Sequence, residues 1–171
     1  MVNLQLMLAG EKEISKIQVL AHRIWKSHYP SVIGMEQVEY MLGRFYSRES
    51  MLDQMQQGQQ FYLVYPGLGA HELIDPIGFV SISEAGGGQY FIHKFYIDQE
   101  LHRRGVGTAV FSELLTIYGG SIQQLRLQVN RQNFKPINFY FKLGFVIERV
   151  ADFDIGDGYF MNDFVMVWHA K

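Results

Sequence analysis

The chain contains no cysteine. This absence excludes disulfide bonds, thiolate metal ligands and a cysteine nucleophile, and nothing in the composition suggests secretion. No apolar run is long enough to cross a bilayer, and the first residues lack the charged start and apolar core of a signal peptide. We therefore expect a cytoplasmic protein with no membrane partner.

The chain also lacks a large excess of charge of either sign, since its net charge is −2. A nucleic-acid partner is therefore not expected, and any anion site must be local. The six histidines show no paired ligand spacing, which predicts no metal site, and no G-x-S-x-G sequence offers a serine nucleophile. With 171 residues, of which 48% are hydrophobic, the chain predicts one globular domain over residues 1–171.

Hydrophobic periodicity predicts a mixed α/β fold, a sheet with helices packed on its faces. Ser47 is expected to be the N-cap of a short helix that ends before Gly58. We predict strands at 2–9, 61–65, 77–83, 90–97, 123–130, 145–153 and 159–169, and further helices at 11–26, 35–45, 106–118 and 134–143.

The stretch from Tyr90 to Tyr118 predicts a strand, a basic glycine loop and a helix. A helix that opens on Arg103-Arg104-Gly105-Val106-Gly107 offers free N–H groups, a positive dipole end and two cations, which suit a phosphate. The dinucleotide motif G-x-G-x-x-G fails because Val110 stands at its third glycine, and the P-loop pattern is absent. This motif alone leaves an ordinary strand–helix turn open as an alternative.

A second block, Val129 to Phe145, again predicts a strand, a polar turn and a helix. Asn133 lies at the N-cap position, and its capping bond is expected to go to the N–H of Lys135, because Pro136 has no N–H. Tyr140 lies on the same helix, which ends at Gly144.

Together the two blocks resemble the GNAT superfamily of acyl-CoA-dependent N-acyltransferases. The family's pyrophosphate motif corresponds to the run from His102 to Gly107, although His102 replaces the usual Gln or Arg. Its later motif corresponds to Asn133, Pro136, Phe139, Tyr140, Lys142, Gly144 and Phe145, with Pro136 in place of the usual Ala. The regions 25–29, 35–46 and 154–166 are similar to bacterial diamine and polyamine acetyltransferases.

The resemblance implies a GNAT-type, mostly antiparallel, twisted sheet of about seven strands with helices on both faces. It also implies acetyl-CoA as acyl donor and a homodimer, for which the hairpin 145–169 would supply an interface. The residues implied to hold the donor are Phe95, Tyr96 and Ile97 for the pantetheine and thioester, His102, Arg103, Arg104, Gly105, Val106, Gly107 and Thr108 for the pyrophosphate, and Asn133, Tyr140 and Lys142 from the later motif.

The resemblance makes Tyr140 the general acid that protonates the leaving thiolate. A thiol pKa of about 8.5 and a tyrosine pKa of about 10 make this transfer uphill by roughly two units, which a polarising site can offset. The candidates for the general base are Glu84 and His93. Alternatively, Glu84 is a solvated turn residue, His93 is a core histidine, and a chain of water molecules removes the proton. The candidate substrate-binding residues are Trp25, His28, Tyr29 and Tyr46; the alternative is that they only pack helices together. Asp163 is a candidate ligand of a cationic amine, and the alternative is that it is an outward-facing strand residue.

The expected function is direct transfer of an acetyl group from acetyl-CoA to a primary amine of a small molecule, with polyamines as one class. The first alternative is a peptide or protein N-terminal acetyltransferase, which a wider groove near the last hairpin would favour. The second is a non-catalytic CoA-binding or sensing module, which would keep the Gly105 site but have no use for Tyr140.

Overall fold

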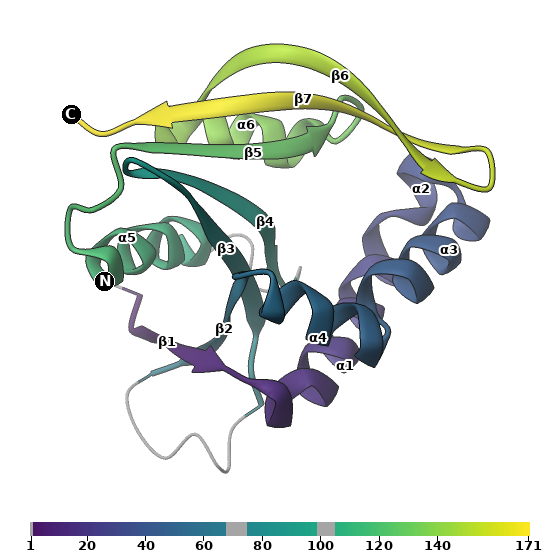
Figure 1. Ribbon diagram of the computed structural model, residues 1–171, viewed down its shortest axis with the longest axis horizontal. Coiled ribbons are helices and arrows are strands. Elements are labelled where there is room, and N and C mark those ends of the chain that lie inside the picture. Colours follow the sequence, from purple (N-terminus) through teal and green to yellow (C-terminus); the bar gives the residue numbers. More distant parts are fainter. Residues whose placement is uncertain (1, 68–74, 99–104) are drawn as a thin grey trace.

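The structure is a computed structural model that describes residues 2–67, 75–98 and 105–171. Its strands form one seven-stranded sheet in the order β1-β2-β3-β4-β5-β7-β6 (Figure 1). The strands are β1 (Leu4–Ala9), β2 (Gln60–Pro66), β3 (Gly78–Gly86), β4 (Gln89–Ile97), β5 (Gln124–Asn130), β6 (Val146–Gly156) and β7 (Tyr159–His169). The helices are α1 (Ile14–His28), α2 (Pro30–Ile33), α3 (Met35–Tyr46), α4 (Arg48–Gln56), α5 (Val106–Tyr118) and α6 (Phe134–Leu143), with a 3₁₀ turn at Glu11–Glu13.

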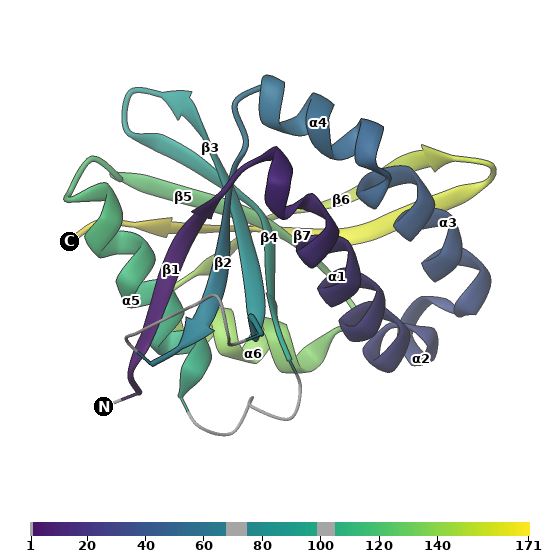
Figure 2. The ribbon, with the colours of Figure 1, turned by 90° about the horizontal axis from the view of Figure 1, so that it is seen from below.

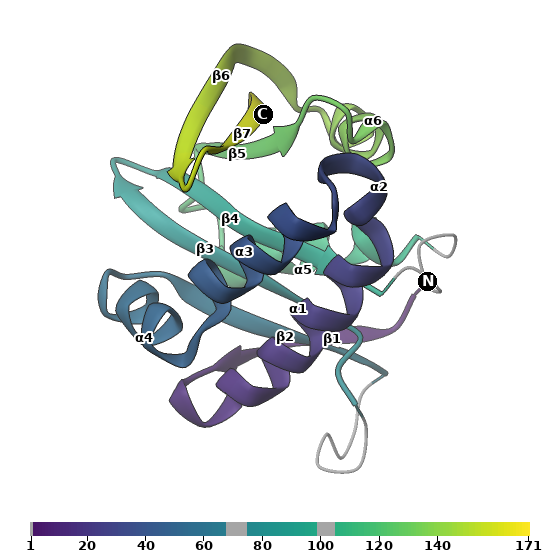
Figure 3. The ribbon, with the colours of Figure 1, turned by 90° about the vertical axis from the view of Figure 1, so that its right-hand side faces the viewer.

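Every neighbouring pair of strands is antiparallel except β4 and β5, which are parallel. Helices cover both faces, with α1 to α4 on one side and α5 and α6 on the other (Figures 2 and 3). The GNAT-type fold expected from the sequence is therefore confirmed.

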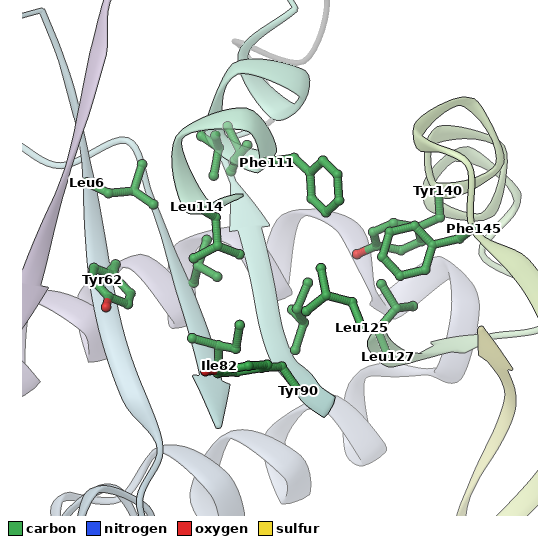
Figure 4. Close-up of a cluster of buried hydrophobic side chains, with 14 of the residues drawn as sticks. Leu6, Tyr62, Ile82, Tyr90, Phe111, Leu114, Leu125, Leu127, Tyr140 and Phe145 are labelled. Carbon is green, nitrogen blue, oxygen red and sulfur yellow. The ribbon is translucent and has the colours of Figure 1, made fainter. Parts of the chain in front are cut away.

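Two hydrophobic clusters hold the helices to the sheet. In β2, Phe61, Leu63 and Tyr65 belong to the cluster under α1, α3 and α4, whereas Tyr62 and Val64 belong to the cluster under α5 and α6. Figure 4 shows part of the second cluster, in which Leu114 of α5 lies among residues of the sheet. Strands covered on both faces read as continuous apolar runs, as β2 does.

The parallel pairing of β4 with β5 is short and ends at a β-bulge. Its register runs only from Gln89↔Gln124 to Ile92↔Leu127. On the other side of β4, Ser81 pairs with Lys94 and Ile82 with Ile92, so that His93 is an extra residue in the strand. Beyond this bulge, the ends of β4 and β5 are no longer paired with each other, and this opening positions the site described below.

Most predicted elements are confirmed to within a few residues, including the N-cap of α4, where Ser47 Oγ accepts from the N–H of Ser50 at 3.2 Å. The sequence analysis missed the one-turn helix α2, which begins at Pro30. The predicted capping bond of Asn133 is wrong, because its side chain makes none. None of the helices in the described ranges is both long and apolar enough to cross a membrane.

Candidate active site

A large cavity follows the opening between β4 and β5. Its volume is about 1180 Å³, which exceeds the several hundred Å³ typical of a site for one small molecule. At one end, which we call the donor half, the walls come from the start of α5, from α6 and from the end of β5. At the other end, the acceptor half, they come from α1, α3, α4 and β7.

The donor half contains the uncapped N-terminus of α5. Gly105 precedes the helix in the left-handed conformation, with φ of 70°, and no side chain caps the first turn. Among the described residues, the first bond of this turn is donated by the N–H of Ala109 to the Gly105 carbonyl, and the preceding N–H groups have no acceptor there, which suits them to bind an anion. Gly105, Gly107 and Thr108 line the cavity here, whereas the Val106 side chain is buried in the core.

Gly107 is required by close packing between α5 and α6. A Cβ at this position would lie 2.8 Å from Cζ of Phe139, whose ring also lines the cavity. Lys135 and Lys142 of α6 lie along the same walls. Free N–H groups, a glycine cradle and two cations fit the pyrophosphate of CoA. His102, Arg103 and Arg104, which the sequence assigned to the same role, lie outside the described residues.

Phe95, Tyr96 and Ile97, expected to face the pantetheine and thioester, all line the cavity, on the part of β4 that β5 leaves unpaired. Tyr140 lies across from them on α6, with its ring centroid 6.4 Å from that of Phe95 and 5.6 Å from that of Phe145 (Figure 4). No hydrogen bond within the described chain involves the Tyr140 hydroxyl. Burial first, and nearby Tyr29 second, raise the pKa of Tyr140 above its ordinary value, so the phenol keeps its proton.

The raised pKa of Tyr140 makes proton donation to a thiolate harder than the ordinary tyrosine value suggested. The general-acid role therefore depends on polarisation of the site during the reaction. The structure brings Tyr140 and the predicted thioester strand together in one cavity, as that role requires.

Asn133 ties α6 to the end of α1, in place of the cap that was predicted. Its Oδ1 lies 2.8 Å from His28 Nε2, and its Nδ2 donates to the Tyr29 hydroxyl at 3.4 Å. Because a carbonyl oxygen can only accept, the His28 proton lies on Nε2 in this arrangement. Asn133, His28 and Tyr29 all line the cavity where its two halves meet.

The acceptor half is rich in aromatic side chains. Trp25 lies at its centre, with ring centroids 4.5 Å from Tyr29, 5.8 Å from Tyr46 and 5.7 Å from Tyr96. Burial raises the pKa of Tyr29 to about 12 and raises those of Tyr46 and Tyr96 well above the ordinary tyrosine value, so all three are neutral at physiological pH. Within the described residues, the Trp25 indole N–H is the only fully buried side-chain polar atom without a hydrogen-bond partner.

Asp163 gives this half a buried carboxyl group. It lies on β7 opposite Asn130 and Ala151, is only 6% exposed and lines the cavity, so it is not an outward-facing strand residue. Desolvation raises its pKa to about 6, partly offset by the charge of Arg131. No ion pair in the described ranges includes Asp163; Arg131 instead binds Asp152 at 2.6 Å.

The two candidate bases differ in position. Glu84 lies near the exposed end of the β3–β4 hairpin and is not among the residues that line the cavity. His93 lines the cavity, with Nε2 2.7 Å from Ser83 Oγ. Desolvation, with the charge of Lys94 second, lowers the pKa of His93 to about 4.

Several polar residues of the acceptor half were not predicted from the sequence, and three of them matter below. Asp53 and Gln54 of α4 and Lys94 of β4 all line the cavity, and Lys94 is 9% exposed. The sequence feature that could have identified Lys94 is its position inside the aromatic run of β4. Among the described residues, no three His, Asp or Glu side chains gather closely enough to hold a metal ion.

Comparisons with known proteins agree with this arrangement. The sequence model of the acetyltransferase (GNAT) family matches residues 23–145, which is more than half of the chain. A spermidine N(1)-acetyltransferase of Thermoplasma acidophilum is 26% identical over 156 residues, which cover 91% of this chain and 90% of that protein.

Two solved structures share the fold. The PaiA N-acetyltransferase of Thermoplasma acidophilum, in complex with coenzyme A, has a TM-score of 0.77 at 22% identity and covers 98% of this chain and 99% of its own. A chimera of the Vibrio cholerae spermidine N-acetyltransferase SpeG with hSSAT has a TM-score of 0.68 at 15% identity, over 98% of this chain and 95% of its own. The chain therefore belongs to the GNAT acetyltransferase family, as an N-acetyltransferase whose acyl donor is acetyl-CoA.

Proposed function

We propose that the acceptor is a small, cationic primary amine of the polyamine class. The observation that carries the proposal is the makeup of the acceptor half, where the ring of Tyr29 lies near Trp25 in an aromatic wall, and its pKa is raised by burial and, in part, by the charge of the buried Asp163. Aromatic faces and a carboxylate are the groups that recognise an alkylammonium. Asp53, from α4, adds a second carboxylate to the same half.

The tip of the β6–β7 hairpin supports a small acceptor over a peptide. Tyr40 of α3 donates to the Ile155 carbonyl at 2.5 Å, and Gln37 donates to the Phe160 carbonyl at 2.8 Å. The rings of Tyr40 and Tyr159 lie 4.9 Å apart. The hairpin tip therefore lies against α3 beside the acceptor half, whereas an extended peptide would need an open groove between these two elements (Figure 1).

Different residues of the site would have different roles in acetyl transfer. Acetyl-CoA, when bound, supplies an activated acetyl group as a thioester. Residues at the start of α5 would hold its pyrophosphate, and backbone groups near Phe95 would orient the thioester and polarise its carbonyl. The aromatic wall and Asp163 would position the amine, and Tyr140 would hold the proton that the leaving sulfur needs.

The wider proposal includes one acetyltransferase domain over residues 1–171, a cytoplasmic location and a homodimer. Support for the domain is the single sheet to which the strands from β1 to β7 belong. Support for the location is the cysteine-free composition. Support for the dimer is the edge strand β6 with the adjoining hairpin, where Val146 and Val150 are 55% exposed and Phe160 is 45% exposed.

Acetylation assays test the acceptor class. The purified protein and acetyl-CoA are offered spermidine, putrescine, a free amino acid and a peptide with a free N-terminus, and thiol release is measured. Turnover should be highest with the two polyamines, and Asp163→Asn should raise their KM. Efficient turnover of the peptide alone would overturn the proposal in favour of N-terminal acetylation. Protection against thermal unfolding by CoA, expected at about 2.7 kcal/mol for a hundredfold excess over Kd, tests the donor half separately.

A further inference from the structure

Lys94 is a buried lysine that has no carboxylate partner among the residues that the structure describes. It lies on β4 directly after the bulge, and its Nζ lies 5.7 Å from the Tyr46 ring centroid and 5.1 Å from that of Phe61. Its hydrogen bonds go to two amide oxygens, Oε1 of Gln54 and, at 3.4 Å, Oε1 of Gln59. Because burial of an unpaired charge is costly, this arrangement favours the neutral amine more than a surface lysine would.

The two amides are held with their oxygens toward Lys94. Gln54 Nε2 donates to the Phe45 carbonyl at 2.8 Å and lies 3.0 Å from Ser50 Oγ. Gln59 Oε1 also accepts from Ser81 Oγ at 2.8 Å. Two N–H groups of Lys94 are therefore used by acceptors. The remaining position of Nζ is a third N–H when the amine is charged and a lone pair when it is neutral.

Desolvation lowers the pKa of Lys94 to about 7, so about half of the molecules carry the lone pair at neutral pH. Of the elements packed against it, β2 and β3 present the uncharged Phe61 and Ser81. The titratable and charged groups that face the same cavity from the other elements are His93 and Tyr96 on β4, Arg44 and Tyr46 on α3, Asp53 on α4, His28 on α1 with Tyr29 directly after it, Lys135, Tyr140 and Lys142 on α6, and Asp163 on β7.

We infer that Lys94 is the general base, which takes a proton from the acceptor amine directly or through one water. The inference rests on the proposed function. The acceptor ammonium first loses one proton to solvent, which gives its nitrogen a lone pair. As the nitrogen–carbon bond forms, the amine nitrogen gives up a second proton to the Lys94 lone pair. As the carbon–sulfur bond breaks, the sulfur receives a proton from Tyr140. The Lys94 ammonium then returns its proton to solvent and Tyr140 regains one, so the net reaction releases one proton for each ammonium that is acetylated.

Lys94 suits this role better than the bases considered from the sequence. A base works best when its pKa is near the working pH, because it is then both available and strong. His93 has a pKa of about 4 and binds Ser83, which makes it a weak base. Glu84 does not line the cavity.

Two substitutions at one site test the inference. Lys94→Met removes the amine and keeps the apolar stem, and Lys94→Arg keeps a positive charge that does not titrate. Lys16→Met is the matched control, because Lys16 also lies over a tyrosine ring, at 5.9 Å from the Tyr65 centroid, but outside the cavity. For each variant, kcat and KM are measured with spermidine from pH 5.5 to 9.5 under saturating acetyl-CoA, together with Tm in the presence and absence of CoA.

For the wild type and Lys16→Met, kcat should rise with pH through about 7, because the base must be neutral. Both Lys94 variants should lose about 10²- to 10⁴-fold in kcat and lack this step, while the KM for acetyl-CoA and the CoA-induced shift in Tm persist. If Lys94→Arg keeps its activity, Lys94 acts as a fixed cation, and the inference is wrong. A wild-type pH profile in Lys94→Met would likewise overturn it, even with a lowered Tm. If the wild type acetylates no amine, the proposed function itself fails, which is visible before any variant is made.

Discussion

Binding of a cationic acceptor should depend on pH through Asp163. This carboxyl group is buried in the acceptor half, has a pKa of about 6 in the free protein and takes part in no ion pair among the described residues. An ammonium placed beside it would stabilise the carboxylate and lower that pKa. Binding therefore requires loss of the proton that Asp163 carries at low pH, and the acceptor should bind more weakly as the pH falls.

The magnitude follows from the pKa of Asp163, because the apparent affinity scales with the fraction of the free protein that is ionised. With a pKa of about 6, this fraction is about one half at pH 6 and about one eleventh at pH 5. Spermidine should therefore bind about tenfold more weakly at pH 5 than at pH 8, and binding at pH 6 should release about half a proton.

Isothermal titration of the CoA-bound protein with spermidine, in buffers of different ionisation enthalpy, measures both quantities. CoA carries no acetyl group, so no turnover occurs. Asp163→Asn is the control. It should bind spermidine more weakly at pH 8, show little dependence on pH and keep its Tm, because the neutral amide avoids the desolvation of a carboxylate. Any dependence left in this variant reports on Lys94, which lines the same cavity and has a pKa of about 7. Equal wild-type affinity at pH 5 and pH 8 would refute the role of Asp163.

Three further substitutions test other parts of the molecule. Tyr140→Phe should lower kcat by about a hundredfold or more with an unchanged KM for acetyl-CoA, because the hydroxyl has no partner in the described chain and its proposed role is that of the acid; full activity at every pH would contradict this. Gly107→Ala should destabilise the protein by about 1–3 kcal/mol in denaturant titrations, because the new Cβ would lie 2.8 Å from the Phe139 ring. The same substitution should reduce the protection that CoA gives against unfolding. Unchanged protection would show that this turn is not the pyrophosphate site. Ser47→Ala should cost about 1 kcal/mol of unfolding free energy, through the lost bond to the N–H of Ser50, and leave kcat unchanged.

Local patterns account for what the sequence predicted well. The apolar stripe of α5, the glycines at its two ends and the alternation in β5 each depend on residues close together in the chain. The order of these elements, combined with the two motifs, was enough to identify the fold. The short helix α2 was missed because a proline usually marks the end of a helix, whereas Pro30 occupies the first position of this one.

Contacts between distant segments account for what the sequence did not show. Asn133 occupies the place of an N-cap, but its side chain binds His28 and Tyr29, which are 105 and 104 residues away. Asp163 could be read as an outward-facing residue because alternation in β7 does not reveal which helices lie over each face. Burial in the folded chain, which local alternation does not reveal, raises the pKa of Asp163.

The bulge at His93 explains why Lys94 was overlooked. In a regular strand Lys94 would share the face of Ile92, two residues before it. The extra residue reverses this alternation, so that Phe95 joins Ile92 in the cluster under α5 and α6, whereas Lys94 faces Tyr46 and Phe61 on the opposite side.

The same bulge lies where the pairing of β4 with β5 ends. One inserted residue thus frees a strand edge beside the predicted thioester position, brings Phe95 beside Tyr140 and turns an amine toward the acceptor half. Bulges occur often next to active sites because they re-aim side chains without altering the rest of the sheet. Here the bulge puts Phe95 on the side of Tyr140, the proposed acid, and turns Lys94, the proposed base, to the opposite side, so that the two proposed proton transfers, from the amine and to the sulfur, use different groups.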